Sequence, residues 1–350
     1  MAEAAAAAEQ PTRRYLQDLL DRELKEPEKL EPCAWFDFNI GTMASLDVTS
    51  STQKMGVCAF NKSPKRQSRE APLILLWSTD EPKQQKDLQG HITGATRCRF
   101  FPSYELTVST HQRSGNVHIW AVDSGVCVQK LRGHTDTVTD VDFVDKGRNI
   151  ITASFDGLIK YWDCTVGEEA ASFKHGSVGV SCLRTICLAK DSQPDQLKEQ
   201  LFVIGVDSHR LKGYDLKSNQ LWFDYKCVAY GRPVNLEQFG PHQVLCATQS
   251  GSIFLFDLRM NSSISTEACE MCYADRHRSG PRQLALLRAH NGFYTAFSNG
   301  CVAFRRELTP VPDVWLSSSN YPVTDLATDG PNLYSCAYDG IVRKYAIHRP

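Results

Sequence analysis

The residues best suited to chemistry in this sequence are its cysteines and histidines, so a metal site is the first possibility to weigh. Cys269 and Cys272 stand in C-x-x-C spacing, and His277 follows them. Thiolates and imidazoles are the ligands that zinc prefers, but a structural zinc site needs a fourth ligand at a suitable spacing. None is evident nearby. We therefore expect a loop with two thiols and no bound metal.

Catalytic motifs are the second possibility. The sequence has no G-x-x-x-x-G-K-[ST] phosphate loop, no G-x-S-x-G nucleophile and no H-E-x-x-H metal motif. His91, His134 and His175 each stand at the start of a similar segment, where a structural role is far more common than a catalytic one. We expect no cofactor, and we expect that the protein is not an enzyme.

The elements that would position these histidines are clearest in residues 133–163. The segment opens with Gly133-His134 and closes with Trp162-Asp163. Between them lie two β-rich runs, 138–144 and 149–154, then an Asp156-Gly157 turn and a third run, 158–162. Asp-Gly between alternating hydrophobic residues is a strong hairpin signal, because glycine tolerates the positive φ of such turns.

This segment resembles a WD repeat, which forms one blade of a β-propeller. The resemblance implies a structural tetrad in which a tryptophan N–H, a hydroxyl, a histidine and an aspartate form a buried chain of hydrogen bonds. Such a chain satisfies polar groups that would otherwise be costly to bury. The residues at the matching positions are His134, Ser154, Asp156 and Trp162.

Aromatic residues recur along the chain at the position of Trp162. Their spacing is between 41 and 52 residues, close to the period of about 40–45 expected for propeller blades. The two longest steps contain polar insertions, residues 190–200 and 261–278, that are typical of exposed loops. Seven positions predict an all-β, seven-bladed propeller. They are Trp77, Trp120, Trp162, Tyr214, Phe256, Phe304 and Tyr345.

The ring must be closed by the beginning of the chain. The sequence stops soon after Tyr345, so the last blade lacks an outer strand, whereas the β-like run 34–40 precedes the first blade and has no other partner. We expect this run to complete the seventh blade, which removes an exposed sheet edge. We expect two regions: an N-terminal extension, 1–32, with a short helix over 12–26, and the propeller, 33–350.

Composition limits the partners and the compartment. The chain has 350 residues and a net charge of −1, so no bulk attraction to nucleic acid or to a membrane is expected. Its 13 scattered cysteines favour reduced thiols in a cytoplasmic or nuclear protein over a disulfide framework. No signal peptide and no membrane span are apparent. A basic loop, 62–69, is interpreted as a solvated hairpin loop rather than a phosphate or nuclear-import site.

Several segments resemble the proteasomal ATPase-associated factor, a WD-repeat family. They are residues 98–103 (CRFFPS), 145–164 (DKGRNIITASFDGLIKYWDC), 277–280 (HRSG) and 334–345 (YSCAYDGIVRKY). The similarity is closest over 90–175 and 277–347, and the middle of the chain matches mainly in order and spacing. The resemblance implies an assembly chaperone. It would hold the C-terminal domain of a proteasomal regulatory-particle ATPase before the base joins the core particle, and so restrain proteasome activity.

A binding platform of this kind needs exposed anchors on one rim of the ring, formed by the loops at the Gly-His starts and the Asp-Gly turns. Phe155 and Tyr338 each precede a turn aspartate and should point outward, and aromatic and arginine residues are enriched at interface hot spots. We expect a monomer that binds its partner there. The candidate partner-binding residues are Arg113, Asp136, Phe155, Tyr230, Arg232, Arg278 and Tyr338.

A substrate receptor of a cullin–RING ubiquitin ligase is the alternative. The tetrapeptide Phe256-Asp257-Leu258-Arg259 resembles the W-D-x-R docking motif of that group, with phenylalanine in place of tryptophan. We favour an ordinary strand end as the explanation, because a single substituted tetrapeptide often matches such a motif by chance. Co-purifying proteins would distinguish the two functions, because one predicts a proteasomal ATPase and the other a ligase adaptor.

Overall fold

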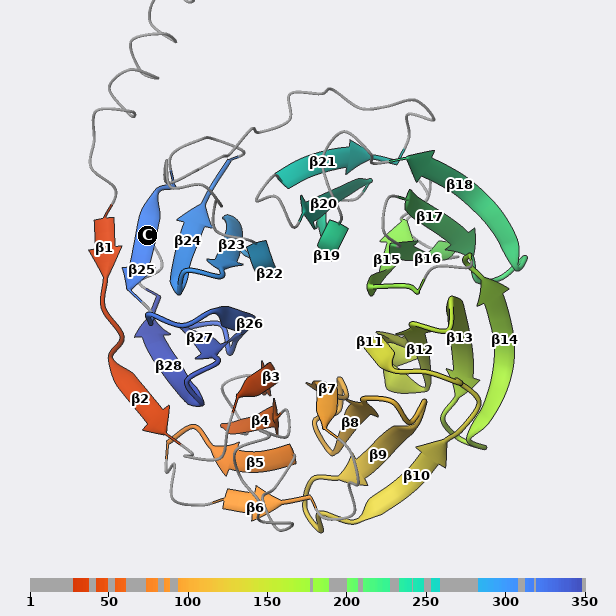
Figure 1. Cartoon of the computed structure of the whole chain (residues 1–350), viewed down its shortest axis with the longest axis horizontal. Helices are drawn as coiled ribbons and strands as arrows, with labels where there is room; N and C mark the ends of the chain where they lie inside the picture. The colour runs from red at the N-terminus through yellow and green to blue at the C-terminus, as the bar shows by residue number, and fades with distance from the viewer. Residues whose placement is uncertain are drawn as a thin grey trace, which may run out of the picture.

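The computed structural model shows a ring of β-sheets around a central axis (Figure 1). In the described residues the chain forms 28 strands and one 3-10 helix, and no α-helix. The structure describes residues 28–37, 42–49, 54–60, 74–80, 85–88, 94–176, 179–188, 200–206, 210–226, 233–240, 242–248, 253–258, 283–307, 312–317 and 319–347.

The strands form seven sheets, which we call blades and number in chain order. Blade 1 contains β3 (Met43–Val48), β4 (Met55–Phe60), β5 (Ile74–Ser78) and β6 (Gln85–Asp87). Blade 2 contains β7 (Ala95–Phe100), β8 (Leu106–His111), β9 (Val117–Ala121) and β10 (Cys127–Leu131). Blade 3 contains β11 (Val138–Val144), the 3-10 helix η1 (Asp145–Gly147), β12 (Asn149–Ser154), β13 (Leu158–Asp163) and β14 (Glu168–Lys174).

The later blades repeat this plan with local differences. Blade 4 contains β15 (Cys182–Leu188), β16 (Gln200–Val206), β17 (Arg210–Asp215) and β18 (Gln220–Lys226), and blade 5 contains β19 (Pro233–Gly240), β20 (Gln243–Thr248) and β21 (Ile253–Asp257). Blade 6 contains β22 (Gln283–Ala289), β23 (Gly292–Phe297), β24 (Cys301–Arg305) and β25 (Val314–Ser317). Blade 7 contains β26 (Val323–Thr328), β27 (Asn332–Ala337) and β28 (Ile341–Ala346).

The hydrophobic core lies between neighbouring blades. Val108 and Ile119 of blade 2, for example, share a buried cluster with Val141 and Trp162 of blade 3. Both faces of the middle strands are therefore covered, which explains why β12 is buried along its whole length although it is a strand of an antiparallel sheet.

The N-terminal strand closes the ring as predicted. β2 (Ala34–Asp37) pairs antiparallel with β28, the third strand of blade 7. The side chain of Phe36 is buried against Trp77 of blade 1, with 4.8 Å between the ring centroids. The first and last blades are thereby joined by both hydrogen bonds and apolar contacts.

A second N-terminal strand was not expected from the sequence. β1 (Glu28–Leu30) runs parallel to β25 on the outer edge of blade 6, so residues 28–37 lie across two neighbouring blades (Figure 1). The short helix expected over 12–26 lies outside the described residues. Within those residues, no helical segment has the length and hydrophobicity that a transmembrane helix requires.

Candidate functional site

The tetrad of blade 3 exists, but one member differs from the prediction. The indole Nε1 of Trp162 donates to Thr152 Oγ1 at 2.8 Å, and His134 Nε2 lies 2.7 Å from the same oxygen. His134 Nδ1 lies 2.8 Å from Asp156 Oδ2. Thr152, rather than Ser154, is therefore the hydroxyl member of the chain.

Strand register explains the correction. Trp162 pairs with Ile150, and its indole leans along the sheet to Thr152, the next residue on the same face of β12. Ser154 points to the same side but lies one step further along, at the turn. Its hydroxyl donates to the carbonyl of Asp136 at 3.2 Å and accepts the amide of Asp156 at 3.1 Å.

The electrostatics of this chain indicate a structural role. Burial lowers the pKa of His134, and the hydrogen bond that its Nδ1 makes to the carboxylate of Asp156 offsets only part of that effect. Burial also opposes ionisation of Asp156, but hydrogen bonds from the amides of Thr135 and Leu158 and from His134 outweigh it and lower its pKa. A neutral imidazole between a hydroxyl and a carboxylate satisfies buried polar groups.

The same position in other blades carries related pairs. Trp77 Nε1 donates to Cys58 Sγ at 3.2 Å, and Trp120 Nε1 donates to Ser109 Oγ at 2.9 Å. In blade 6 the pattern differs from the prediction: Arg305, which pairs with Phe293, occupies the tryptophan position, and its Nη1 donates to Thr295 Oγ1 at 2.7 Å. The prediction of Phe304 for this position was wrong by one residue.

Three of the predicted binding residues lie together on one face of the ring. We call the first strand of each blade, which lies nearest the central axis, its inner strand (Figure 1). The rim face is the end of the ring that carries the loops entering the inner strands and the turns between the second and third strands. Here the amide of Arg113 donates to Thr137 Oγ1 at 2.9 Å, and the amide of Phe155 donates to the carbonyl of Thr137 at 3.0 Å. The amide of Thr137 donates to Asp136 Oδ1. Thr137 thus links Arg113, Asp136 and Phe155 across blades 2 and 3.

Tyr338 lies on blade 7, beside a residue that the sequence analysis missed. Its amide donates to the carbonyl of Pro322 at 3.0 Å, as the amide of Phe155 does to Thr137. Tyr321 precedes Pro322 and is 56% exposed, against 47% for Tyr338 and 46% for Phe155. Asp136 stands two residues before β11, and Tyr321 stands two residues before β26. The same count applied to every blade would have identified Tyr321 from the sequence.

The remaining predicted residues belong to other parts of the chain. Tyr230, Arg232 and Arg278 lie outside the described residues. So do Cys269, Cys272 and His277, which were considered as zinc ligands. The described part of the chain holds no group of three or more side chains suited to a metal ion. Nine cysteines whose side chains the structure describes are free thiols.

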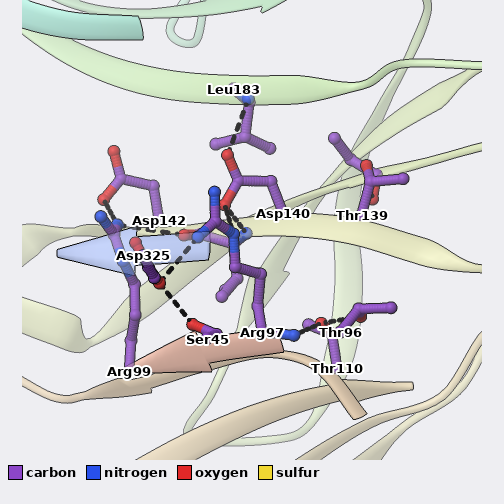
Figure 2. Close-up of polar contacts among 12 residues, drawn as sticks. Ser45, Thr96, Arg97, Arg99, Thr110, Thr139, Asp140, Asp142, Leu183 and Asp325 are labelled. Carbon is purple, nitrogen blue, oxygen red and sulfur yellow. Dashed lines mark hydrogen bonds and ion pairs between the residues drawn. The ribbon is translucent and has the colours of Figure 1, made fainter. Parts of the chain in front are cut away.

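A belt of ion pairs around the central axis is the main polar feature that the sequence analysis missed (Figure 2). Arg97 Nη1 of blade 2 lies 2.9 Å from Asp325 Oδ2 of blade 7, and its Nε lies 3.3 Å from Asp140 Oδ1 of blade 3. Ser45 of blade 1 also donates to Asp325 at 2.8 Å. The guanidinium of Arg97 therefore links blade 2 to blades 3 and 7.

The belt continues through blades 3, 4 and 5. Arg99 Nη1 lies 2.9 Å from Asp142 Oδ1, and Arg184 Nη2 lies 2.6 Å from Glu237 Oε1. Burial opposes ionisation of Asp142, but Arg184 and Arg99 outweigh it and hold its pKa below the usual value. Each of these charges is thus compensated by a neighbour on the next inner strand.

The carboxylates of the belt also hold backbone groups of the following blade. Asp140 Oδ2 accepts the amide of Leu183 at 3.1 Å, and Asp142 Oδ2 accepts that of Thr185 at 2.7 Å. Each pair is separated by 43 residues, one blade period. The belt joins inner strands at equal height, so we interpret it as a structural device. The available sequence signal was a pair of like charges at every second position, arginine at 97 and 99 and aspartate at 140 and 142.

Comparisons with known proteins agree with this architecture. Residues 125–163 match the family model described as WD domain, G-beta repeat. Human pre-mRNA-processing factor 17 is 25% identical over 146 residues, covering 41% of this chain and 24% of that protein. Human apoptotic protease-activating factor 1 is 28% identical over 141 residues, covering 38% of this chain and 10% of that protein.

A further match concerns the proteasome. The 26S proteasome regulatory subunit RPN14 of Saccharomyces cerevisiae is 40% identical over 85 residues, covering 24% of this chain and 20% of that protein. The aligned stretches span a quarter or less of the length of each of these three relatives.

Proposed function

We propose that this WD40-repeat β-propeller is a protein-binding scaffold whose partner is a proteasomal regulatory-particle ATPase, held through the rim face. In this proposal the chain acts as an assembly chaperone: it binds the C-terminal domain of the ATPase and restrains proteasome activity while it is bound. It carries out no chemistry on its partner.

The pair of exposed aromatic positions on the rim face carries the proposal. Phe155 of blade 3 and Tyr338 of blade 7 occupy the same place in their turns, and both side chains are about half exposed although the rest of each turn is ordered by hydrogen bonds. Rigid, exposed aromatic residues lose little conformational entropy on binding and are enriched at interface hot spots. Tyr321 adds a third such residue beside Tyr338.

The identity of the partner rests on sequence similarity. The segments 98–103, 145–164 and 334–345 resemble the proteasomal ATPase-associated factor, and the last of them contains Tyr338. The match to a regulatory subunit of the yeast 26S proteasome supports the same assignment, at 40% identity over 85 residues. A scaffold role is consistent with partial similarity to proteins as different as a pre-mRNA-processing factor and an apoptotic protease-activating factor.

Binding to defined partners tests the proposal. The purified chain is titrated with the isolated C-terminal domain of each proteasomal ATPase and, separately, with a cullin–RING ligase adaptor. We expect saturable binding to one ATPase domain and none to the adaptor. Binding to the adaptor with no binding to any ATPase domain would contradict the proposal and favour a ligase receptor.

A further inference from the structure

The turn between the second and third strands of blade 2 is one residue longer than the corresponding turn of blade 3. Six residues lie between the paired residues Thr110 and Val117, whereas five lie between Ala153 and Ile159 in blade 3. The amide of Gln112 donates to the carbonyl of Gly94, just as the amide of Phe155 donates to that of Thr137. Gln112 is therefore the counterpart of Phe155, and the extra residue is Arg113.

Arg113 adopts a backbone conformation that arginine rarely takes. Its φ is +56°, in the left-handed region where a side chain with a Cβ is strained. The hydrogen bond from its amide to Thr137 Oγ1 holds it there. Gly115 of the same turn has a φ of +60°, and a Cβ at this position would lie 2.0 Å from the carbonyl oxygen of His134. The turn thus packs closely against blade 3. Backbone strain of the kind seen at Arg113 clusters at functional sites in proteins.

The result is an exposed guanidinium at the junction of blades 2 and 3. The Arg113 side chain is exposed, and within the described residues it forms no ion pair. Phe155 is anchored to the same residue, Thr137, on the blade 3 side of the junction. A guanidinium binds a carboxylate through two parallel hydrogen bonds, and a half-exposed ring accepts an apolar side chain.

We propose that Arg113 and Phe155 form a composite site for an acidic segment of the partner, one that presents a carboxylate next to an apolar or aromatic side chain. Thr137 is the positioning residue of this site, because its hydroxyl and carbonyl hold both backbones. The inference deepens the proposed function and rests on it: it names the chemistry of the segment that the rim face binds.

Two pairs of variants separate recognition from folding. Arg113→Gly removes the guanidinium and relieves the left-handed strain, so the melting temperature should stay equal or rise while binding is lost. Arg132→Gln, at another exposed arginine, is the matched charge control. Thr137→Val removes the hydroxyl that holds Arg113, and Thr137→Ser retains it, so binding should fall in the first and be rescued in the second.

The probes are the ATPase C-terminal domains and two series of immobilised peptides. Each peptide carries one aromatic residue, flanked by aspartate in one series and by asparagine in the other. We expect the wild-type chain to prefer the aspartate series, and Arg113→Gly to lose this preference with about ten-fold or greater weakening, as for loss of a hydrogen bond to a charged group. Thr137→Val should weaken binding less, and Arg132→Gln should leave it unchanged.

The outcomes distinguish this inference from the proposed function. If no ATPase domain binds but the aspartate preference is present and depends on Arg113, the partner assignment fails and the composite site stands. If an ATPase domain binds wild type and Arg113→Gly equally, and the two peptide series bind alike, the composite site is refuted while the proposed function stands. Loss of binding with a matching loss of melting temperature in Arg113→Gly would show a purely structural turn and would also refute it.

Discussion

Replacement of Thr152 by valine should destabilise the protein more than any other single loss of a hydroxyl in blade 3. Valine has nearly the same shape as threonine, so the substitution removes the oxygen with little change in packing. Thr152 Oγ1 accepts the indole N–H of Trp162 at 2.8 Å and lies 2.7 Å from His134 Nε2. All three residues are buried, so water cannot replace the lost partner.

The magnitude follows from the groups left behind. A buried polar group that loses its partner costs about 1–3 kcal/mol of unfolding free energy. Thr152→Val leaves two such groups, on Trp162 and His134, which predicts a loss of about 2–5 kcal/mol. Ser154→Ala is the matched control. Its hydroxyl makes two partly buried contacts at the turn, so a loss of about 1 kcal/mol is expected.

Urea unfolding of the two variants, followed by tryptophan fluorescence, measures both losses. The tetrad predicted from the sequence contains Ser154 and would reverse the order, with Ser154→Ala the more damaging change. A Thr152→Val protein within about 0.5 kcal/mol of wild type, the range usual for neutral surface substitutions, would refute the hydrogen-bond chain that we describe.

Three further predictions concern the ring itself. Removal of residues 1–37 should abolish cooperative folding because β2 then no longer closes blade 7, whereas removal of 1–11 should not; a stable, monomeric 38–350 fragment by calorimetry and gel filtration would contradict closure. Burial raises the pKa of Asp47 to about 6, and the nearby charge of Arg99 offsets only part of this shift. Between about pH 4 and 6 the folded state therefore binds a proton that the unfolded state has lost. The free energy of unfolding should fall as the pH rises through this range, by up to about 3 kcal/mol from this group. Asp47→Asn should flatten that slope, and an unchanged slope in chemical denaturation would count against it. Gly56→Ala should cost about 1–3 kcal/mol in urea unfolding, because the new Cβ would lie 2.3 Å from the Trp77 ring; a neutral effect would mean that the ring can move aside.

The sequence predicted the plan of the fold well because turns and periodicity are local. The Gly-His start, the Asp156-Gly157 turn and the closing Trp162 lie within one blade, and the spacing of aromatic residues located the other blades. The closing strand followed from counting strands at the two ends of the chain. β1 was missed because three residues, Glu28–Leu30, carry no alternation from which a strand could be recognised.

Strand register and long-range contacts could not be predicted from local sequence patterns. Thr152 and Ser154 share one face of β12, and only the lean of the Trp162 indole decides between them. In blade 6 an adjacent phenylalanine drew the assignment to 304, although the pairing of Arg305 with Phe293 places the arginine at that position. The pair of Arg97 with Asp325 joins residues 228 apart, which no spacing rule within a blade could indicate.

The candidate binding residues were predicted from turn position, and the structure places four of the seven. Phe155 and Tyr338 are exposed, as expected from their place before a turn aspartate. Asp156 and Asp339 each accept a backbone amide of their own turn, which orders the loop. The link of Arg113 and Asp136 to Phe155 through Thr137 was not foreseen, since it depends on an inserted residue in a neighbouring blade.

The most direct test of the central claim is a calorimetric titration of an ATPase C-terminal domain into the wild-type chain and into the Phe155→Ala/Tyr338→Ala double variant. Truncation of a buried interface aromatic costs about 2 kcal/mol or more, about a thirty-fold loss of affinity. The account predicts at least that loss, with circular dichroism and melting temperature unchanged. A variant with Lys62, Lys65, Arg66 and Arg69 neutralised should bind nearly as wild type at physiological salt. If the basic-loop variant loses the ATPase domain and the double variant retains it, the rim face is not the binding surface.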